Sequence, residues 1–330
     1  MGVRHLGLAR ELFPEAEIKI LTHQPGSEFQ EHPADNFFNM EDALQFSPQI
    51  AVIANPAPFH LEIAQQLVEV GTHLLIEKPI SISTNGIDKL LETSKKLNTV
   101  VAIGYNLRFD PSLQELHRLL RDGQIGTAFS VRCEVGQYLP TWRSGNDYRN
   151  GVSANQKLGG GVLLELSHEI DYLRWIFGDF KWVKATLCRQ STLEIDVEDS
   201  AHLTFGFLRN KEGAELIGTL NLDFIRHDTT RICTVIGESG SLRWDGILGK
   251  VDLYQEGNTD WVTVYERSAN LDHTYKAEWS NFLQSIDGLE TPKVTGVDAF
   301  KVVEFILAAR MSSKSGSLVE INASHSKDGV

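Results

Sequence analysis

Residues 50–60, IAVIANPAPFH, contain the feature that decides the fold, a short apolar strand that runs into a polar turn and then a helix. A proline at its start and a glycine after its end bound this helix at about 58–70. In an open α/β sheet, ligands bind beyond the carboxyl ends of the strands, where Asn55 and Pro56 are expected. Taken alone, the segment fits a local helix cap at Asn55 equally well.

The same alternation of strand and helix extends through the first third of the chain. Apolar runs rich in β-branched residues predict strands, and segments of helical period predict the helices between them. The expected strands are 18–21, 50–54, 73–76 and 100–104, and the expected helices are 41–46, 58–70 and 84–97. This pattern predicts an α/β domain with a parallel sheet.

Beyond about residue 125, strand-like runs follow one another with turn signals between them. Such a run predicts consecutive antiparallel strands in one large open sheet. The expected strands are 127–138, 181–190, 199–209, 213–223, 229–237, 240–245, 250–255 and 261–265, followed by helices at 273–287 and 297–312 and a strand at 318–321. A length of 330 residues also favours two domains over one.

Composition argues against several classes of partner. The net charge of -13 disfavours nucleic acid, because binding to a phosphate backbone depends on clustered Lys and Arg. No stretch approaches the ~18 apolar residues of a membrane span, and the N-terminus lacks the features of a secretory signal. Three scattered cysteines fit reduced thiols, so we expect a protein of the cytoplasm that binds neither nucleic acid nor membrane.

A second informative segment, LLIEKP at 74–79, places Glu77, Lys78 and Pro79 at the carboxyl end of an expected strand. A lysine in this position is placed to exchange a proton with a substrate hydroxyl, and Lys78 is therefore a candidate acid/base. Pro79 is a candidate cis peptide. The alternative is a surface ion pair beside a turn.

A third segment, 158–178, consists of three consecutive glycines followed by a helix. The glycines permit close approach of the backbone to a ligand. One stripe of the expected helix is apolar, and the other side carries Glu165, His168, Asp171 and Tyr172. Glu165 and His168 are close enough to orient one another or to hold neighbouring hydroxyls. A solvated polar face with a lone histidine is the alternative.

A fourth segment, the loop at 138–150, mixes aromatic rings with planar hydrogen-bonding groups. Sugars are bound by such mixtures, with ring faces against C–H surfaces and polar groups on the hydroxyls. Trp142, Tyr148 and Arg149 are the candidates for these contacts. Packing of a long loop over the sheet is the competing interpretation.

Three motifs together resemble the glucose-fructose oxidoreductase and inositol dehydrogenase (Gfo/Idh/MocA) family. They are the Asn-Pro-x-x-x-His turn, the Glu-Lys-Pro tripeptide, and the Gly-Gly-Gly run that is followed by an acid and His-x-x-Asp. Residues 104–111 and 123–126 also resemble that family's crossover between domains. The resemblance implies an NAD(P)-binding Rossmann-like domain at 1–106 and a substrate-binding and oligomerisation domain at 107–330. It further implies a homodimer or homotetramer.

The resemblance also implies the chemistry. Lys78 matches the family's catalytic lysine, Glu165 its substrate-binding acid and His168 its acid/base histidine. The implied reaction is hydride transfer between NAD or NADP and a sugar, cyclitol or nucleotide-sugar, with proton transfer at the hydroxyl. Expected cofactor-binding residues are Gly2, Asn55, Pro56, His60, Glu77, Lys78 and Asn106. Expected substrate-binding residues are Trp142, Tyr148, Arg149, Glu165 and His168. No metal site is predicted, and the 138–150 loop suggests, by analogy, surface-polysaccharide metabolism.

Two features depart from the family pattern. Many relatives carry Asp four residues before the histidine, whereas Glu165 precedes His168 by three. Relatives also begin with an apolar strand leading into Gly-x-Gly-x-x-Gly, whereas this chain opens with MGVRHL, which resembles the end of that motif with Gly2 as its final glycine. The second hypothesis is therefore a catalytically silent sugar-binding or assembly subunit that binds dinucleotide weakly. Residues 22–24 carry neither an acid nor an arginine to distinguish NAD from NADP.

Overall fold

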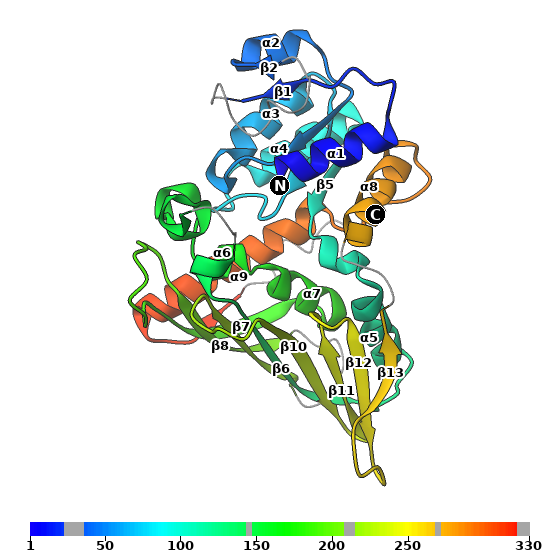
Figure 1. Cartoon of the computed structure of the whole chain (residues 1–330), viewed down its shortest axis with the longest axis vertical. Helices are drawn as coiled ribbons and strands as arrows, with labels where there is room; N and C mark the ends of the chain where they lie inside the picture. The colour runs from blue at the N-terminus through cyan, green and yellow to red at the C-terminus, as the bar shows by residue number, and fades with distance from the viewer. Residues whose placement is uncertain (23–35, 143–146, 208–214, 268–271, 322–330) are drawn as a thin grey trace. The chain divides into compact units, whose positions relative to one another are not determined.

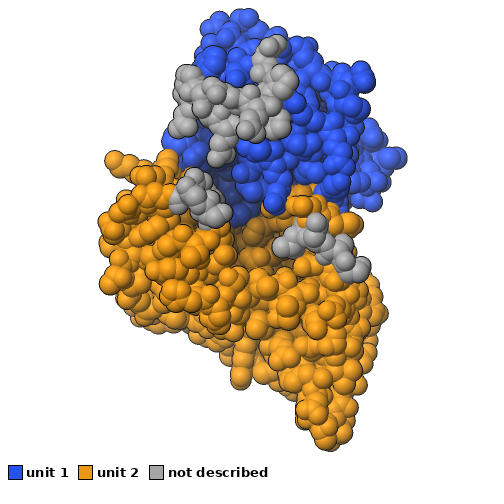
Figure 2. All heavy atoms as spheres, viewed as in Figure 1, with its two compact units in different colours: residues 1–104, 276–297 blue, residues 105–275, 298–330 orange. Residues whose placement is uncertain are grey.

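The computed structural model describes residues 1–22, 36–142, 147–207, 215–267 and 272–321. The chain forms two compact units, shown in blue and orange in Figure 2: unit 1 is 1–104 with 276–297, and unit 2 is 105–275 with 298–330. The first boundary lies close to the one expected from the sequence. Unit 1 also contains the segment 276–297, which the sequence analysis placed with the second domain.

Unit 1 is built from parallel strands connected by helices (Figure 1). Its strands are β1 (Ile20–Leu21), paired with β2 (Asn36–Phe37), and β3 (Ile50–Ile53), β4 (His73–Glu77) and β5 (Val101–Gly104), paired in that order. Its helices are α1 (Gly2–Leu12), α2 (Met40–Gln45), α3 (His60–Glu69), α4 (Ile87–Leu97) and most of α8 (Asp272–Ile286). The expected parallel α/β sheet is confirmed.

The middle of the central strand, β4, is apolar. Leu74, Leu75 and Ile76 of β4 have no exposed surface, as is typical of a parallel strand covered by helices on both faces. Gly71 has a φ of +86°, and this left-handed residue lets the chain turn from α3 into β4. The apolar core therefore holds β4 in the middle of the three-stranded piece.

The strands of unit 1 fall into two pieces, β1-β2 and β3-β4-β5. Among the residues that the structure describes, no strand pairs with both β1 and β3. At the opposite edge, the Ile103 N–H donates to the Val294 carbonyl at 3.2 Å, and Ala102 bridges to Thr295. These bonds to the edge strand explain why residues 276–297 belong to unit 1.

Unit 2 contains a nine-stranded sheet in the order β13-β12-β11-β10-β6-β9-β8-β7-β14. The strands are β6 (Ala128–Gly136), β7 (Phe180–Cys188), β8 (Ser200–Phe207), β9 (Ile217–Asp223), β10 (Thr230–Gly237), β11 (Gly240–Asp245), β12 (Lys250–Gln255), β13 (Val262–Glu266) and β14 (Val319–Glu320). The large, mainly antiparallel sheet is confirmed, but the strands are not all consecutive antiparallel neighbours. β6 pairs in parallel with β9 and lies between β9 and β10, because the chain leaves the sheet after β6 and returns at β7.

Helices cover one face of this sheet. Figure 1 shows α5 (Pro111–Arg121), α6 (Val162–Glu165), α7 (His168–Phe177) and α9 (Gly296–Ser315) on the same side. The start of α5 is determined locally, because Pro111 occupies its first turn and the Asp110 carboxylate accepts the Ser112 N–H at 2.8 Å. In the described part of the chain no helix covers the other face of the sheet, and no helix is long and apolar enough to cross a bilayer.

Candidate functional site

Two turns of unit 1 leave the sheet at the same edge. Ile53 of β3 pairs with Ile76 of β4, and Glu77 pairs with Gly104 of β5, so the strands end side by side. The residues that follow β3 include Asn55 and Pro56, and those that follow β4 are Lys78 and Pro79. The Lys78–Pro79 peptide bond is cis, as expected from the sequence. The register therefore brings both motifs to the carboxyl edge where ligands bind in such sheets.

His60 connects these two turns. Its Nε2 lies 2.6 Å from the Asn55 carbonyl and its Nδ1 lies 3.0 Å from the Pro79 carbonyl. Burial lowers the pKa of His60, although both backbone contacts and the charge of Glu77 oppose the shift. The histidine of the Asn-Pro-x-x-x-His turn thus links the Asn-Pro turn to the cis-proline turn through the backbone.

Glu77 is buried, and its carboxylate has a partner that the sequence analysis did not find. His5 Nε2 lies 2.8 Å from Glu77 Oε1, and the Lys78 backbone N–H donates to Glu77 Oε2 at 3.2 Å. On the other side of the ring, Trp279 Nε1 donates to His5 Nδ1 at 3.0 Å. Burial opposes ionisation, but His5 and the charge of Lys78 outweigh it and hold the pKa of Glu77 below its usual value. No local pattern connects residues 5, 77 and 279, so only the fold reveals this chain of hydrogen bonds.

The carboxyl group of Glu278, also in unit 1, has a pKa shift in the opposite direction to that of Glu77. Glu278 is buried, and within the described residues neither of its side-chain oxygens has a hydrogen-bond partner. Burial, reinforced by the charge of Glu77, raises the pKa of Glu278 well above the ordinary range. The two buried carboxyls of unit 1 therefore have pKa shifts in opposite directions.

The edge of unit 1 offers groups of the kind that a dinucleotide uses. Gly2 is the first residue of α1, and Met1 provides no side-chain cap for the N–H groups of the first turn, which suit a phosphate. The Asn55 Oδ1 atom is buried and has no hydrogen-bond partner in the described part of the chain, so it can accept from a ligand hydroxyl or amide. The first turn of α1 and the Asn55 oxygen therefore provide donors and an acceptor of the kind that a dinucleotide uses. Asn106 lies in unit 2, where its amide donates to Thr274 Oγ1 at 2.7 Å.

In unit 2, Glu165 and His168 do not belong to one continuous helix. α6 ends at Glu165 and α7 begins at His168, with Leu166 and Ser167 between them. The single helix expected between the triple glycine and Gly178 is therefore wrong, and the argument from three-residue spacing does not apply. Ser153 Oγ donates to Glu165 Oε2 at 2.9 Å, and the ring of His168 meets Tyr105 edge-on with centroids 5.5 Å apart.

The expected separation of an apolar face from a polar face is also wrong for α7. Asp171 and Tyr172 are fully buried, because α7 has neighbours on both sides. Asp171 accepts two hydrogen bonds from Arg108, at 2.9 Å from Nε and 2.6 Å from Nη2, and the Tyr172 hydroxyl lies 2.8 Å from Cys133 Sγ. Burial disfavours the charged guanidinium, but Asp171 raises the pKa of Arg108 above its ordinary value. Arg108 was missed by the sequence analysis.

The triple glycine serves packing within the protein. A Cβ atom on Gly160 would collide with the backbone carbonyls of Val152 and Ser153. Gly161 has a φ of +102°, and a Cβ there would collide with the Glu198 carboxyl. At Gly160 and Gly161 neighbouring protein groups therefore lie close to the backbone, where a ligand was expected. This packing places the loop that carries Ser153 against the start of α6.

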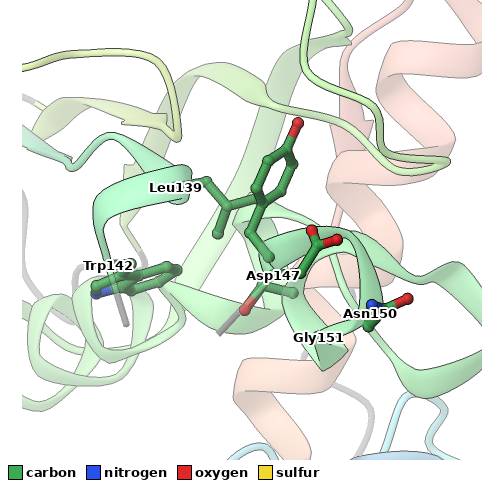
Figure 3. Close-up of a pocket in the computed structure, with 7 residues that line it drawn as sticks. Leu139, Trp142, Asp147, Asn150 and Gly151 are labelled. Carbon is green, nitrogen blue, oxygen red and sulfur yellow. The ribbon is translucent and has the colours of Figure 1, made fainter. Parts of the chain in front are cut away.

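Described residues between 139 and 153 line a pocket of about 320 Å³ (Figure 3). Its described lining residues are Leu139, Trp142, Asp147, Tyr148, Asn150, Gly151 and Ser153. Two of the three substrate-binding residues expected in the 138–150 loop therefore line it. The third, Arg149, pairs with the Asp147 carboxylate at 2.8 Å and with Glu194 at 3.3 Å. Other parts of the loop, and His23 and Gln24, lie outside the described residues.

Comparison with known proteins matches both halves of the chain to one family. Residues 5–105 match the oxidoreductase family's NAD-binding Rossmann fold, and residues 117–321 match its C-terminal alpha/beta domain. The chain belongs to the Gfo/Idh/MocA oxidoreductase family. Within this family the amino-terminal domain is the NAD(P)-binding domain, so the expected family, fold class and cofactor type are confirmed.

Individual Gfo/Idh/MocA relatives are distant. D-glucoside 3-dehydrogenase of Escherichia coli is 22% identical over 84% of this chain and 81% of its own. The match to an oxidoreductase of Formosa agariphila, at 24% identity, spans 62% of each chain. A levoglucosan dehydrogenase structure with NADH aligns with a TM-score of 0.84 at 18% identity, covering 98% and 96% of the two chains. The WlbA dehydrogenase of Chromobacterium violaceum, with NADH and UDP-GlcNAcA, aligns with a TM-score of 0.81 at 20% identity, covering 98% and 93%. These structural matches show a shared fold.

Proposed function

We propose that this chain is an NAD(P)-dependent oxidoreductase that acts on a hydroxyl or carbonyl of a sugar, cyclitol or nucleotide-sugar. The observation that carries the proposal is the pocket of Figure 3, in which aromatic and hydrogen-bonding groups lie together and Ser153 connects to Glu165. The named relatives support it, since they act on a glucoside or are solved with levoglucosan or a nucleotide-sugar.

The proposed roles divide between the two units. In unit 1, Lys78 exchanges a proton with the substrate hydroxyl, and the turn that carries it is connected through Pro79 to His60. In unit 2, Glu165 binds a substrate hydroxyl and His168 serves as the second proton-exchange group. Trp142 and Tyr148 provide ring faces for the sugar.

Oxidation of an alcohol must remove a hydride from carbon and a proton from oxygen. When bound, the nicotinamide ring supplies the hydride acceptor. The proton passes from the hydroxyl to Lys78 or His168, and in the reverse direction the same group returns it to the carbonyl oxygen. Glu165 accepts a hydrogen bond from a neighbouring hydroxyl in this scheme.

The test is a titration of the purified chain with NAD⁺ and NADP⁺ by calorimetry, followed by an absorbance assay for nicotinamide reduction. The sugar panel contains hexoses, cyclitols, glycosides and nucleotide-sugars. We expect cofactor binding and sugar-dependent reduction that is lost in the Lys78→Met variant. Failure to bind both cofactor and any sugar contradicts the proposal.

A second candidate function is a sugar-binding or assembly subunit without catalysis. The observation that favours it is the interruption of the unit 1 sheet between β1 and β3 in the described chain. A strand missing at this place removes hydrogen-bond partners from both neighbours and weakens the dinucleotide site. Sugar binding without cofactor binding in the same titrations is the result that this second function predicts.

We further propose a homodimer or homotetramer formed through the uncovered face of the nine-stranded sheet. The absence of a covering helix on that face of the described chain supports an interface there. Light scattering of the purified chain measures the oligomeric state. A cytoplasmic location and a role in surface-polysaccharide metabolism are further predictions, to be checked by cell fractionation and by the polysaccharide profile of a deletion strain.

A further inference from the structure

One hydrogen bond connects the lining of the pocket in Figure 3 to Glu165, the proposed substrate-binding acid. Ser153 is buried, lines the pocket and donates to Glu165 Oε2 at 2.9 Å. A ligand whose reacting ring is held by Glu165 can therefore extend past Ser153 into the pocket. The pocket is thus placed to bind a second part of the same molecule.

The lining of the pocket suits a sugar ring. Figure 3 shows Leu139 and Trp142 on one side and Asp147 and Asn150 on the other. The Trp142 ring is half-buried and is supported by Phe224, with centroids 5.4 Å apart. An indole face packs on the C–H surface of a sugar, while carboxylate and amide groups bind its hydroxyls.

The charge of the described lining residues disfavours an anionic ligand. Among its described lining residues there is no Lys or Arg, and Asp147 contributes a negative charge. The neighbouring Arg149 gives Nε and Nη2 to Asp147, at 2.9 and 2.8 Å, and Nη1 to Glu194 at 3.3 Å. A diphosphate in the pocket would face these carboxylates and compete with them for the guanidinium.

The size of the pocket agrees with a single ring. Its volume of about 320 Å³ lies at the lower end of the roughly 300–1,000 Å³ that small-molecule pockets span. A hexose ring fits this space more readily than a nucleoside with two phosphates. Volume, aromatic surface and negative charge therefore indicate the same kind of occupant.

We infer that this pocket is a subsite for a second, uncharged sugar ring, and that the substrate of the chain is a neutral glycoside or oligosaccharide. The inference rests on the proposed function, since it assigns the reacting ring to Glu165 and His168. It narrows that function by excluding nucleotide-sugars as preferred substrates. Trp142 is the specificity-determining residue of the subsite.

The experiment compares each hexose of a panel in three forms: the free sugar, its disaccharide and its UDP-sugar. Binding is measured by calorimetry, and KM and kcat are measured with NAD(P)⁺. We expect the best disaccharide to bind about 10-fold more tightly than its free sugar, the scale of one aromatic contact, and more tightly than the UDP-sugar. Trp142→Ala should remove this advantage, so that the disaccharide binds no more tightly than its free sugar.

Two further variants separate the subsite from general damage to the fold. Trp142→Phe keeps an aromatic face and should retain most of the disaccharide preference. Trp261→Ala removes a half-exposed tryptophan that stacks on Arg243 outside the pocket, and should change no sugar affinity. An equal loss of free-sugar and disaccharide binding in Trp142→Ala, or tighter binding of the UDP-sugar, overturns the inference.

The calorimetry also distinguishes this inference from the proposed function. Trp142-dependent disaccharide binding without any turnover supports the subsite and contradicts the enzyme. Turnover without a disaccharide advantage supports the enzyme and contradicts the subsite. If no form of any hexose binds, both fail.

Discussion

Unit 2 contains two arginine–aspartate pairs with almost the same geometry in very different surroundings. Arg108 and Asp171 meet at 2.6 Å with side chains 4% and 1% exposed, whereas Arg149 and Asp147 meet at 2.8 Å with side chains 50% and 39% exposed. The first pair holds α7, the helix that begins at His168, and the second lies at the rim of the pocket. Burial, and not bond length, therefore determines which pair maintains the fold and which one a ligand can rearrange.

The largest expected effect is on the buried pair. Asp171→Ala removes the nearer carboxylate from the buried Arg108 guanidinium and leaves Asp298 at 3.6 Å. Breaking a buried pair costs about 3–5 kcal/mol. We expect a clear fall in the urea midpoint of unfolding. Asp147→Ala is the matched control, and because its pair is exposed we expect no measurable change in the midpoint. Equal losses in the two variants would show that burial does not distinguish the pairs.

The next effect concerns a residue proposed to act in the reaction. Lys78→Met should reduce kcat by more than ~100-fold, the scale of general acid–base catalysis, with the native fold retained. Steady-state kinetics and circular dichroism measure the two properties. Lys89→Met, an exposed lysine of α4, is the control and should have normal kinetics. Near-normal turnover in Lys78→Met would remove Lys78 from the mechanism.

A substitution of His168 tests whether this first residue of α7 exchanges a proton with the substrate. In wild type, a histidine that accepts the substrate proton makes oxidation fall about tenfold per pH unit below its pKa, because the protonated ring cannot accept. His168→Asn should remove that acidic limb while sugar binding persists. The measurement is kcat/KM from pH 5 to 8. A limb of unchanged position and slope would indicate that His168 is structural.

The smallest expected effect concerns the two buried carboxyls of unit 1, whose pKa values move in opposite directions. The lowered pKa of Glu77 contributes stability that is present above pH 4.5 and is lost as the pH falls through the folded value. The raised pKa of Glu278 favours the neutral acid, so stability is lost as the pH rises above 4.5.

Glu278→Gln should therefore raise the Tm at pH 7 and have little effect at pH 4, whereas Glu77→Gln should lower the Tm at pH 7. Roughly 1 kcal/mol moves the Tm of a domain of this size by about 2–4 °C, so shifts of a few degrees are expected. Scanning calorimetry from pH 4 to 8 measures both variants. A fall in Tm at pH 7 for Glu278→Gln would contradict the neutral state of Glu278.

Much of the fold followed from local patterns. The strand, turn and helix at 50–70 and the cis bond before Pro79 agree with the structure to within a few residues. Strand-like runs separated by turn signals also located the strands of unit 2, because both signals depend only on nearby residues. The parallel pairing of β6 with β9 was not foreseen, since nothing local specifies which distant strand becomes a neighbour.

The candidate site, like the fold, was predicted from the sequence only in part. The sequence by itself determined the types of residue at the edge of unit 1 and in the 138–150 loop, because motif spacing and turn chemistry are local properties. Only the tertiary structure decided the partners. Glu77 is hydrogen-bonded to His5, Asp171 to Arg108, and Glu165 to Ser153. The physical reason is that burial and hydrogen bonding between distant residues set the charge and orientation of each group, and these contacts exist only once the chain has folded.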